Sequence, residues 1–274
     1  MRNFPGRVPR LSDLVLAIIY EGIDDAADAA GYMTFVANTH DDAQRQRLLG
    51  EAALHRNVEG LIFADARRDE TAFIDELAKR GVPMILVSRH QGRKYCSITC
   101  DDLAGGKMAA DHLVALGHRD FAVLAGEQYS SSGWDRCVGF VERCKALGVE
   151  IRPDSILHGP FDTAAGREAG EQLCARKRKP TAIFAVNDFL AIGVMGALRD
   201  SGMQPGRDVA LVGFNDTPLA AQLPIGLTSV RSPMHPMGFR AMELLVKQLG
   251  GEKPKSERLR PELIVRMSSG GPIG

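Results

Sequence analysis

The sequence predicts an α/β protein built from two doubly wound parallel-sheet lobes, and three observations support this. Short apolar runs rich in β-branched residues alternate with amphipathic stretches, as expected for parallel strands joined by crossover helices. Residues that cap helices mark the ends of the amphipathic stretches. No linker, repeat or low-complexity tract divides the chain, although roughly ten such units exceed what one small open sheet needs. The apolar runs are Met33 to Ala37, Leu61 to Ala64, Met84 to Val87, Phe121 to Ala125, Ala182 to Val186 and Val209 to Phe214.

The stretches between these runs are predicted to be helices from their ends and their period. Polar side chains near a helix start accept hydrogen bonds from free backbone N–H groups, and glycine suits the turn just past a helix end. In residues 105–116 the apolar positions recur at helical spacing, so one stripe of this helix faces a sheet. The expected starts lie near Ser12 or Asp13, Asp41, Thr163 and Asp188, and the expected ends at Gly31, Gly117, Gly148, Gly202 and Gly250.

Two sheets without a linker require the chain to cross from one lobe to the other and back. The polar stretch Leu227 to Pro233 follows the last strong strand–helix unit and is a natural hinge, and the helix beginning near His235 could return to the first lobe. We therefore expect a first lobe of residues 1–117 with 231–258, and a second lobe of residues 118–230 with 259–274.

Composition excludes several functional classes. Lysine plus arginine equals aspartate plus glutamate, at 34 each, so the chain has no net basic charge that would draw it to nucleic acid. Its five cysteines show no CxxC pair, which favours reduced thiols that fill cores in a reducing compartment. No signal peptide and no run of about 18 apolar residues is present, so we expect a cytoplasmic protein without a membrane partner.

Enzyme motifs are missing from the sequence. There is no GxSxG elbow, no HExxH, no phosphate loop with its lysine and hydroxyl residue, and no GxGxxG after a strand. The seven histidines do not cluster at metal-ligand spacings. We therefore expect neither catalysis nor a metal nor a cofactor.

Four segments, spread from Val8 to Met267, together resemble the lactose-repressor/galactose-repressor family of bacterial transcription regulators. Each segment alone is weak evidence, but the four occur in the family's order and spacing. They are Val8 to Asp13 with Gly22-Ile23-Asp24; Asp111-His112-Leu113 through Gly117-His118-Arg119 to Val123-Leu124-Ala125-Gly126; Ala182 to Asp188 with Ala191-Ile192-Gly193 and then Val212 to Asp216; and Leu227 to Arg231 with Met237-Gly238.

The resemblance implies a periplasmic-binding-protein type I core that holds a small effector between two lobes, at the carboxyl ends of the strands. It also implies a homodimer that binds operator DNA through an N-terminal helix-turn-helix domain, which is absent from this chain. The family's first strand would fall on Met1 to Arg7, but this segment is polar and Pro5 cannot donate a ladder hydrogen bond. We therefore expect the first strand to be missing, because the chain is a trimmed form or its start is misplaced; a natural binding protein without a DNA-binding domain is the alternative.

The resemblance also implies ligand-binding residues in both lobes. Arg136 takes the place of the family's ligand arginine, and its planar guanidinium suits a carboxylate, a phosphate or vicinal hydroxyls. Asn187 takes the place of the ligand amide, and its neighbour Asp188 is expected to cap the following helix. Phe161 is either an aromatic face for a sugar ring or a core residue. Ser12 and Asp13 lie in the first loop, which lacks the proline and aromatics frequent in relatives.

An asparagine, Asn215, stands where the family often has an aspartate that accepts from sugar hydroxyls. The amide weakens the case for a plain neutral sugar and removes a charge that would repel an anion. Together with Arg136, it favours a sugar acid such as gluconate or a related anionic carbohydrate, and a gluconate-repressor-like regulator. An exported or stand-alone solute-binding protein of the same fold is the alternative function.

Overall fold

The computed structural model describes residues 2–8 and 13–270, which form two compact α/β units. Unit 1 contains the described residues up to Cys100, together with Tyr129–Ser132 and Pro233–Leu259. Unit 2 contains Asp101–Gln128, Gly133–Ser232 and the described residues from Arg260 onward. The prediction of two α/β lobes with parallel sheets is confirmed.

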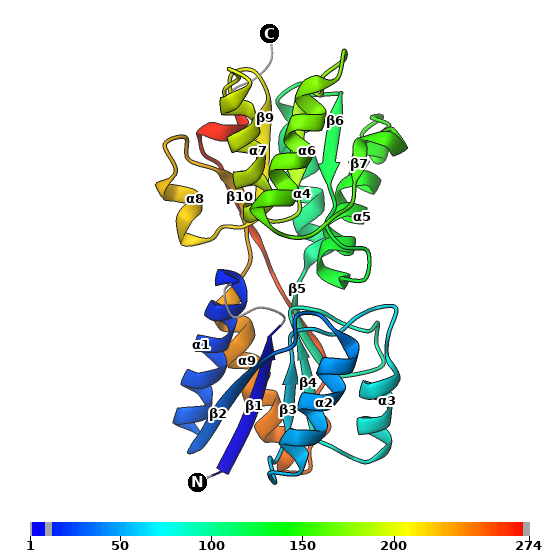
Figure 1. Ribbon diagram of the computed structural model, residues 1–274, viewed down its shortest axis with the longest axis vertical. Helices are drawn as coiled ribbons and strands as arrows, with labels where there is room; N and C mark the ends of the chain where they lie inside the picture. The colour runs from blue at the N-terminus through cyan, green and yellow to red at the C-terminus, as the bar shows by residue number, and fades with distance from the viewer. Residues whose placement is uncertain (1, 9–12, 271–274) are drawn as a thin grey trace. The chain divides into compact units, whose positions relative to one another are not determined.

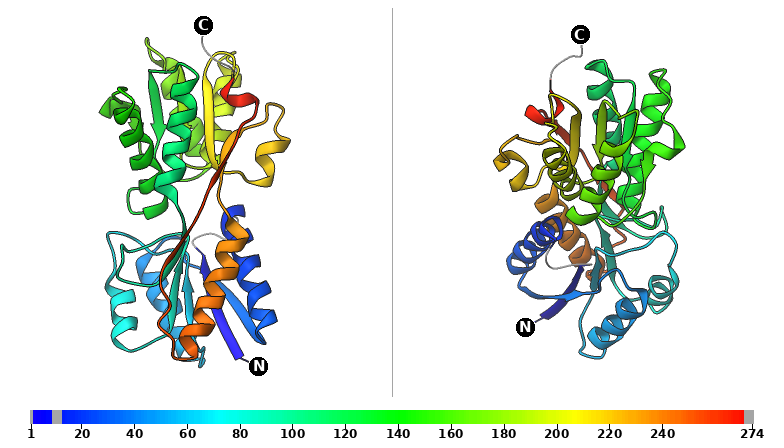
Figure 2. Two further views of the ribbon diagram at one scale, coloured as in Figure 1. Left: turned by 180° about the vertical axis from the view of Figure 1, so that it is seen from behind. Right: turned by 45° about the horizontal axis from the view of Figure 1, so that its top comes forward.

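Unit 1 is built on a six-stranded sheet with the strand order β11-β5-β4-β3-β1-β2, in which every neighbouring pair is parallel. Helices α1 and α9 lie side by side against this sheet (Figures 1 and 2). The strands are β1 (Arg2–Val8), β2 (Tyr32–Asn38), β3 (Leu61–Phe63), β4 (Met84–Val87), β5 (Ser97–Cys100) and β11 (Glu257–Leu259). The helices are α1 (Leu14–Ala29), α2 (Ala43–Leu54), α3 (Ala72–Lys79) and α9 (Met234–Leu249).

The expectation of a missing first strand was wrong, because residues 2–8 form β1. This strand pairs with β2 along its whole length, from Arg2 opposite Tyr32 to Val8 opposite Asn38. Its ladder with β3 contains only Gly6 and Arg7, so Pro5 lies before the point where pairing on that side begins. A proline is tolerated in a strand where no partner needs its absent N–H. The polar composition of the segment gave no indication of this strand.

Close contact between α1 and α9 fixes one face of the unit 1 core. A Cβ on Gly22 would lie 2.1 Å from the carbonyl oxygen of His235, and one on Gly238 would lie 1.8 Å from that of Ile19. Glycine is therefore required at both positions for the helices to approach this closely. Ile19 and Ile23, on the same side of α1, are fully or almost fully buried.

Unit 2 is built on a second six-stranded sheet, with the order β12-β10-β9-β8-β6-β7, in which only the β10–β12 pair is antiparallel. Helices α6 and α7 cover one face and α4 the opposite face (Figures 1 and 2). The strands are β6 (Phe121–Leu124), β7 (Ile156–Leu157), β8 (Ala182–Ala185), β9 (Ala210–Asn215), β10 (Thr228–Arg231) and β12 (Glu262–Ile264). The helices are α4 (Asp102–Ala115), α5 (Ser131–Ala146), α6 (Thr163–Ala175), α7 (Asp188–Asp200) and α8 (Pro218–Gln222), with short 3-10 turns at Pro153–Ser155 and Met267–Ser269.

The cysteines behave largely as core residues. All five, which lie in the described part of the chain, are free thiols, and Cys100, Cys137 and Cys144 are buried. Burial raises the pKa of the Cys137 thiol to about 11. Within the described ranges, no helix is both long and apolar enough to cross a membrane.

Candidate functional site

The carboxyl ends of the unit 2 strands gather four of the predicted site residues. Strands β6, β7, β8 and β9 are parallel, so they end at the same edge of the sheet. Asn187 follows β8, Asn215 ends β9, and Phe161 follows β7. Arg136 reaches the same edge from α5, the helix after β6. Loop ends and helix starts at such an edge are where α/β proteins bind ligands.

Arg136 is buried and held by four contacts within unit 2. Its Nε donates to Asp102 Oδ1 at 2.7 Å, and its Nη1 donates to the carbonyl of Val186 at 2.8 Å and to Asn215 Oδ1 at 3.4 Å. The guanidinium carbon lies 3.8 Å from the centre of the Phe214 ring. Among the described residues these contacts leave the Nη2 group without a hydrogen-bond partner, so it has two N–H donors to offer a ligand.

Glycine on α4 allows Arg136 to come this close to Asp102. A Cβ on Gly106 would lie 2.1 Å from the carbonyl oxygen of Arg136, and the reciprocal Gly139 on α5 would place a Cβ 2.2 Å from the carbonyl oxygen of Leu103. The two helices therefore touch backbone to backbone beside the site. This contact sets the position of the Arg136 backbone, and the guanidinium is then held by the four contacts given above.

The helix cap after β8 is Asn187, and the expectation that Asp188 caps the helix was wrong. Asn187 Oδ1 accepts from the backbone N–H of Leu190 at 2.8 Å, while its Nδ2 donates to the carbonyl of Phe161 at 2.9 Å. Asp188 is instead the first helical residue, and its side chain turns inward. An amide serves better than a carboxylate at this position because it accepts from the helix and donates to the neighbouring loop at once.

Asn215 and Phe161 complete this edge. Asn215 has a backbone φ of 101°, is buried, and donates from Nδ2 to Ser232 Oγ at 3.0 Å. The Phe161 ring packs on glycine backbone, since a Cβ on Gly126 would lie 2.2 Å from it and one on Gly133 would lie 2.8 Å away. Phe161 is only partly buried, so it is neither a full core residue nor a free surface ring.

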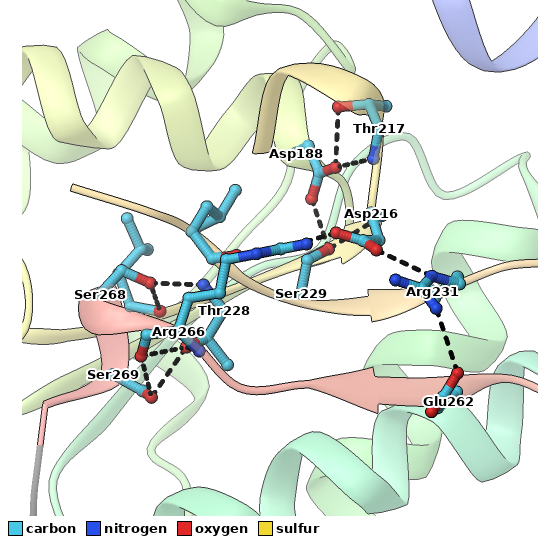
Figure 3. Close-up of polar contacts among 12 residues, drawn as sticks. Asp188, Asp216, Thr217, Thr228, Ser229, Arg231, Glu262, Arg266, Ser268 and Ser269 are labelled. Atoms are coloured by element: carbon cyan, nitrogen blue, oxygen red, sulfur yellow. Dashed lines mark hydrogen bonds and ion pairs between the residues drawn. The ribbon is translucent and has the colours of Figure 1, made fainter. Parts of the chain in front are cut away.

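Next to this edge, Asp188 anchors a polar network that was not predicted from the sequence (Figure 3). Its Oδ2 accepts from the N–H and the hydroxyl of Thr217 at 2.7 and 3.0 Å, and its Oδ1 accepts from the Ser229 hydroxyl at 2.6 Å. Burial raises the pKa of Asp188 to about 6, against the opposing effect of these hydrogen bonds. Asp216, next to Asn215, pairs with both Arg231 and Arg266.

In unit 1 the outcome for the predicted residues is different. Asp13 caps α1, where its Oδ1 accepts from the N–H of Val15 at 2.9 Å, and Ser12 lies outside the described residues. Sequence reasoning missed a charged cluster at the carboxyl ends of β2 and β4. Arg89 donates to both carboxylate oxygens of Asp41, at 2.6 and 3.1 Å, and the Tyr129 hydroxyl donates to the same carboxylate at 3.2 Å.

This charged cluster also contains Arg67, whose guanidinium carbon lies 3.9 Å from the centre of the Tyr129 ring. Arg67 follows β3, so three parallel strands of unit 1 send polar residues to one edge. The available signal was local: Asp41 and Arg89 each come a few residues after a predicted apolar strand. What could not be inferred was their pairing, which joins residues far apart in the chain.

Comparison with known proteins places this chain in a family. The profile of the family described as periplasmic binding protein-like domain matches residues 110–269. The chain belongs to the periplasmic binding protein-like family, in its branch of lactose-repressor-type transcription regulators. It is similar to the HTH-type transcriptional regulator DegA of Bacillus subtilis, with 29% identity over 95% of this chain and 79% of the relative.

Two further members show the same likeness. The HTH-type transcriptional repressor PurR of Erwinia tasmaniensis is 26% identical, over 92% of this chain and 75% of the relative. A solved structure described as a transcriptional regulator CelR–cellobiose complex is 28% identical, covers 97% of this chain and 84% of its own, and has a TM-score of 0.90. These relatives are regulators rather than enzymes, in agreement with the missing catalytic motifs.

Proposed function

We propose that the carboxyl-end edge of unit 2 binds a small carbohydrate-type effector, and that this effector is a sugar acid. The observation that carries the proposal is the convergence of Arg136, Asn187, Asn215 and Phe161 on that edge, with the Nη2 donors of Arg136 still unused in the described part of the protein. Rigid support matters here because a pre-organised donor loses little entropy when a ligand arrives.

The mixture of groups suits a polyhydroxylated molecule with one charged end. Two amides supply donors and acceptors for hydroxyls, and an aromatic ring supplies an apolar face for the C–H side of a sugar. A guanidinium binds a carboxylate through parallel N–H groups and does so more strongly than it binds a neutral oxygen. The uncharged Asn215 adjoins Arg136, so no carboxylate at that position repels an anion.

A neutral sugar is the second candidate, and one observation favours it. Asp102 pairs with Arg136 at 2.7 Å, so the pair as a whole carries no net charge and attracts an anion less than a lone arginine would. The regulator described as a CelR–cellobiose complex binds a neutral disaccharide and is similar to this chain along nearly its whole length.

The substitution Asn215→Asp separates the two candidates. It replaces the amide nitrogen that now donates to Ser232 by an oxygen, and so puts a full negative charge on the group whose Oδ1 lies beside Arg136. A sugar acid should then bind at least about tenfold more weakly because of like-charge repulsion at short range, whereas a neutral sugar should bind equally well or better. Isothermal titration with gluconate, glucose and cellobiose measures both responses.

The control is Asn215→Ser, which removes the amide without adding charge. If gluconate binds the chain and Asn215→Asp leaves its affinity within twofold, the sugar-acid proposal is wrong. If only neutral sugars bind, the second candidate replaces it. Thermal unfolding of each variant without ligand checks that the fold has survived the change.

The remaining function follows from the family as part of this proposal. Effector binding is coupled to the affinity of a homodimeric regulator for operator DNA, in the cytoplasm, as the HTH-type names of the relatives suggest. Linkage then requires that operator binding change effector affinity by the same factor. Analytical ultracentrifugation of this chain tests the dimer directly, and a monomer at all accessible concentrations would contradict it.

A further inference from the structure

An open pocket of about 680 Å³ lies at one edge of the unit 1 sheet, and none of its lining residues belongs to the candidate effector edge of unit 2. It is formed where edge strand β11 pairs in parallel with β5. Its walls come from the loop that leads into β5, residues 90–96, and from the segment that enters β11, residues 254–258. The volume falls within the range typical of sites for small molecules.

The pocket lining is strongly basic. It includes Arg93, Lys94, Lys255 and Arg258, and none of its lining residues is acidic. Lys94 is neutralised by Asp75, whose carboxylate lies 2.8 Å from its Nζ. Arg93, Lys255 and Arg258 are exposed and form no ion pair with any described residue, so three positive charges remain uncompensated around one concavity.

Strand register explains why charges of one sign gather here. Arg258 lies opposite Thr99 in the parallel ladder, and Glu257 lies opposite Ile98. Successive side chains of a strand point to opposite faces, so Arg258 and Glu257 leave the sheet on different sides. Glu257 is held by Arg240 of α9, with oxygen–nitrogen distances of 2.8 and 2.9 Å. The one acid of this segment is therefore paired with Arg240 and is not among the residues that line the pocket.

Two hydroxyl residues of low overall exposure also line the pocket. Ser97 and Thr99 are only 4% and 2% exposed, and they project from the same face of β5 as Arg258 does from β11. Neither hydroxyl makes a hydrogen bond with any described side chain or backbone group. The nearby Ser256 differs, since its Oγ accepts from the N–H of Ser97 at 3.0 Å and donates to the carbonyl of Tyr95 at 3.3 Å. Because both residues line the pocket, their hydroxyls can donate to an acceptor-rich ligand there.

We propose that this pocket is a second ligand site, separate from the effector edge, that binds a small molecule carrying two or more phosphate groups. Three unpaired cations match several negative charges, and the two hydroxyls donate to phosphate oxygens. A concave site with these donors fits a compact ligand better than the backbone of a duplex, whose phosphates are spread along a rod. The site would make the regulator sensitive to phosphorylated metabolites independently of its effector.

Isothermal titration of the 274-residue chain with pyrophosphate at low ionic strength tests the proposal. We expect one site per chain, weakened by added salt because exposed charges are screened. The triple variant Arg93→Ala, Lys255→Ala, Arg258→Ala should lose at least about a hundredfold in affinity, since each charge-assisted contact contributes about tenfold. Thr99→Val, which keeps the shape and removes the hydroxyl, should lose about tenfold.

The matched control changes three exposed lysines of unit 2, with the same loss of charge: Lys145→Ala, Lys177→Ala, Lys179→Ala. It should bind pyrophosphate like the parent protein. Equal losses in both triple variants would show attraction by overall charge alone and would overturn the proposal. Absence of pyrophosphate binding, or binding of duplex DNA but not pyrophosphate through the same three residues, would overturn it too.

Discussion

Replacing the buried carboxylate Asp188 by asparagine should remove a pH-dependent loss of stability from unit 2. Asp188 is fully buried, and three hydrogen bonds from Thr217 and Ser229 hold it in place. In Asp188→Asn, the amide oxygen can still accept from Thr217, and the amide N–H can donate to Ser229 Oγ. The side-chain shape is kept while the charge is removed, so the variant isolates the electrostatic contribution.

The sign and size follow from the pKa of Asp188, which burial raises from its ordinary value of 3.8 to about 6. Between these two values the folded protein binds more protons at this site than the unfolded chain does. Stability from this group is therefore greatest at low pH and is lost as pH rises from about 4 to about 6. The full loss is about 3 kcal/mol, of which about 1.4 kcal/mol falls between pH 5 and pH 7.5.

Urea unfolding at pH 5 and at pH 7.5 measures this loss, and the protein carries its own probe. The only tryptophan of the chain, Trp134, lies in α5 of unit 2, so its fluorescence reports the unfolding of that unit. The free energy of unfolding of the parent relative to Asp188→Asn should fall by about 1.4 kcal/mol between the two pH values. The other titratable groups are the same in both proteins, so their contributions cancel in this difference. If the free energies of unfolding of the parent and of Asp188→Asn change equally with pH, the reasoning is refuted and the pKa of Asp188 lies near its ordinary value.

Two further variants test the supports of the two polar edges. Gly106→Ala should destabilise unit 2 by about 1–3 kcal/mol, because its Cβ meets the backbone of α5 at 2.1 Å, whereas Gly159→Ala, in open space, should change stability by less than about 0.5 kcal/mol. Asp41→Asn should destabilise unit 1 by about 3–5 kcal/mol, because the buried Arg89 would lose its ion pair. Differential scanning calorimetry of each variant gives the values, and an unchanged melting temperature in Gly106→Ala or Asp41→Asn would contradict the corresponding contact.

The strands were predictable where the signal was local. Each of the six apolar runs forms a strand, within a residue or two at the ends. Five of them are fully buried, which demands continuous apolar sequence, whereas the run Met33 to Ala37 forms the edge strand β2 and leaves Phe35 exposed. The segment 2–8 was not predicted as a strand because it lacks this apolar signal: it is polar and contains Pro5. Its strand depends on backbone pairing with β2, and backbone hydrogen bonds leave no mark on side-chain composition.

Four of the predicted site residues lie together at one edge of unit 2, and their role in effector binding stays a prediction, but the residues that hold them in place were not predictable from the sequence. Family resemblance singled out Arg136, Asn187 and Asn215, and the structure brings them to one edge together with Phe161. Nothing in the sequence paired Arg136 with Asp102, because that contact depends on two glycines that let α4 and α5 touch. The sequence pattern also did not show which residue caps α7, because either side chain of an Asn-Asp pair can accept a hydrogen bond from the backbone N–H groups at a helix start.

The pairing with Asp102 determines how the role of Arg136 has to be tested. A truncation such as Arg136→Ala would leave the Asp102 carboxylate buried without its cation, and removing one partner of such a pair costs about 3–5 kcal/mol. Lost ligand binding in that variant would not distinguish a missing contact from a loosened fold. The double variant Arg136→Gln with Asp102→Asn removes both charges and keeps a hydrogen-bonding group at the places of Arg136 Nε and the Asp102 carboxylate. If it retains the melting temperature of the parent and still loses gluconate binding, Arg136 acts on the ligand; if binding survives, the guanidinium is structural and the selectivity resides in the amides.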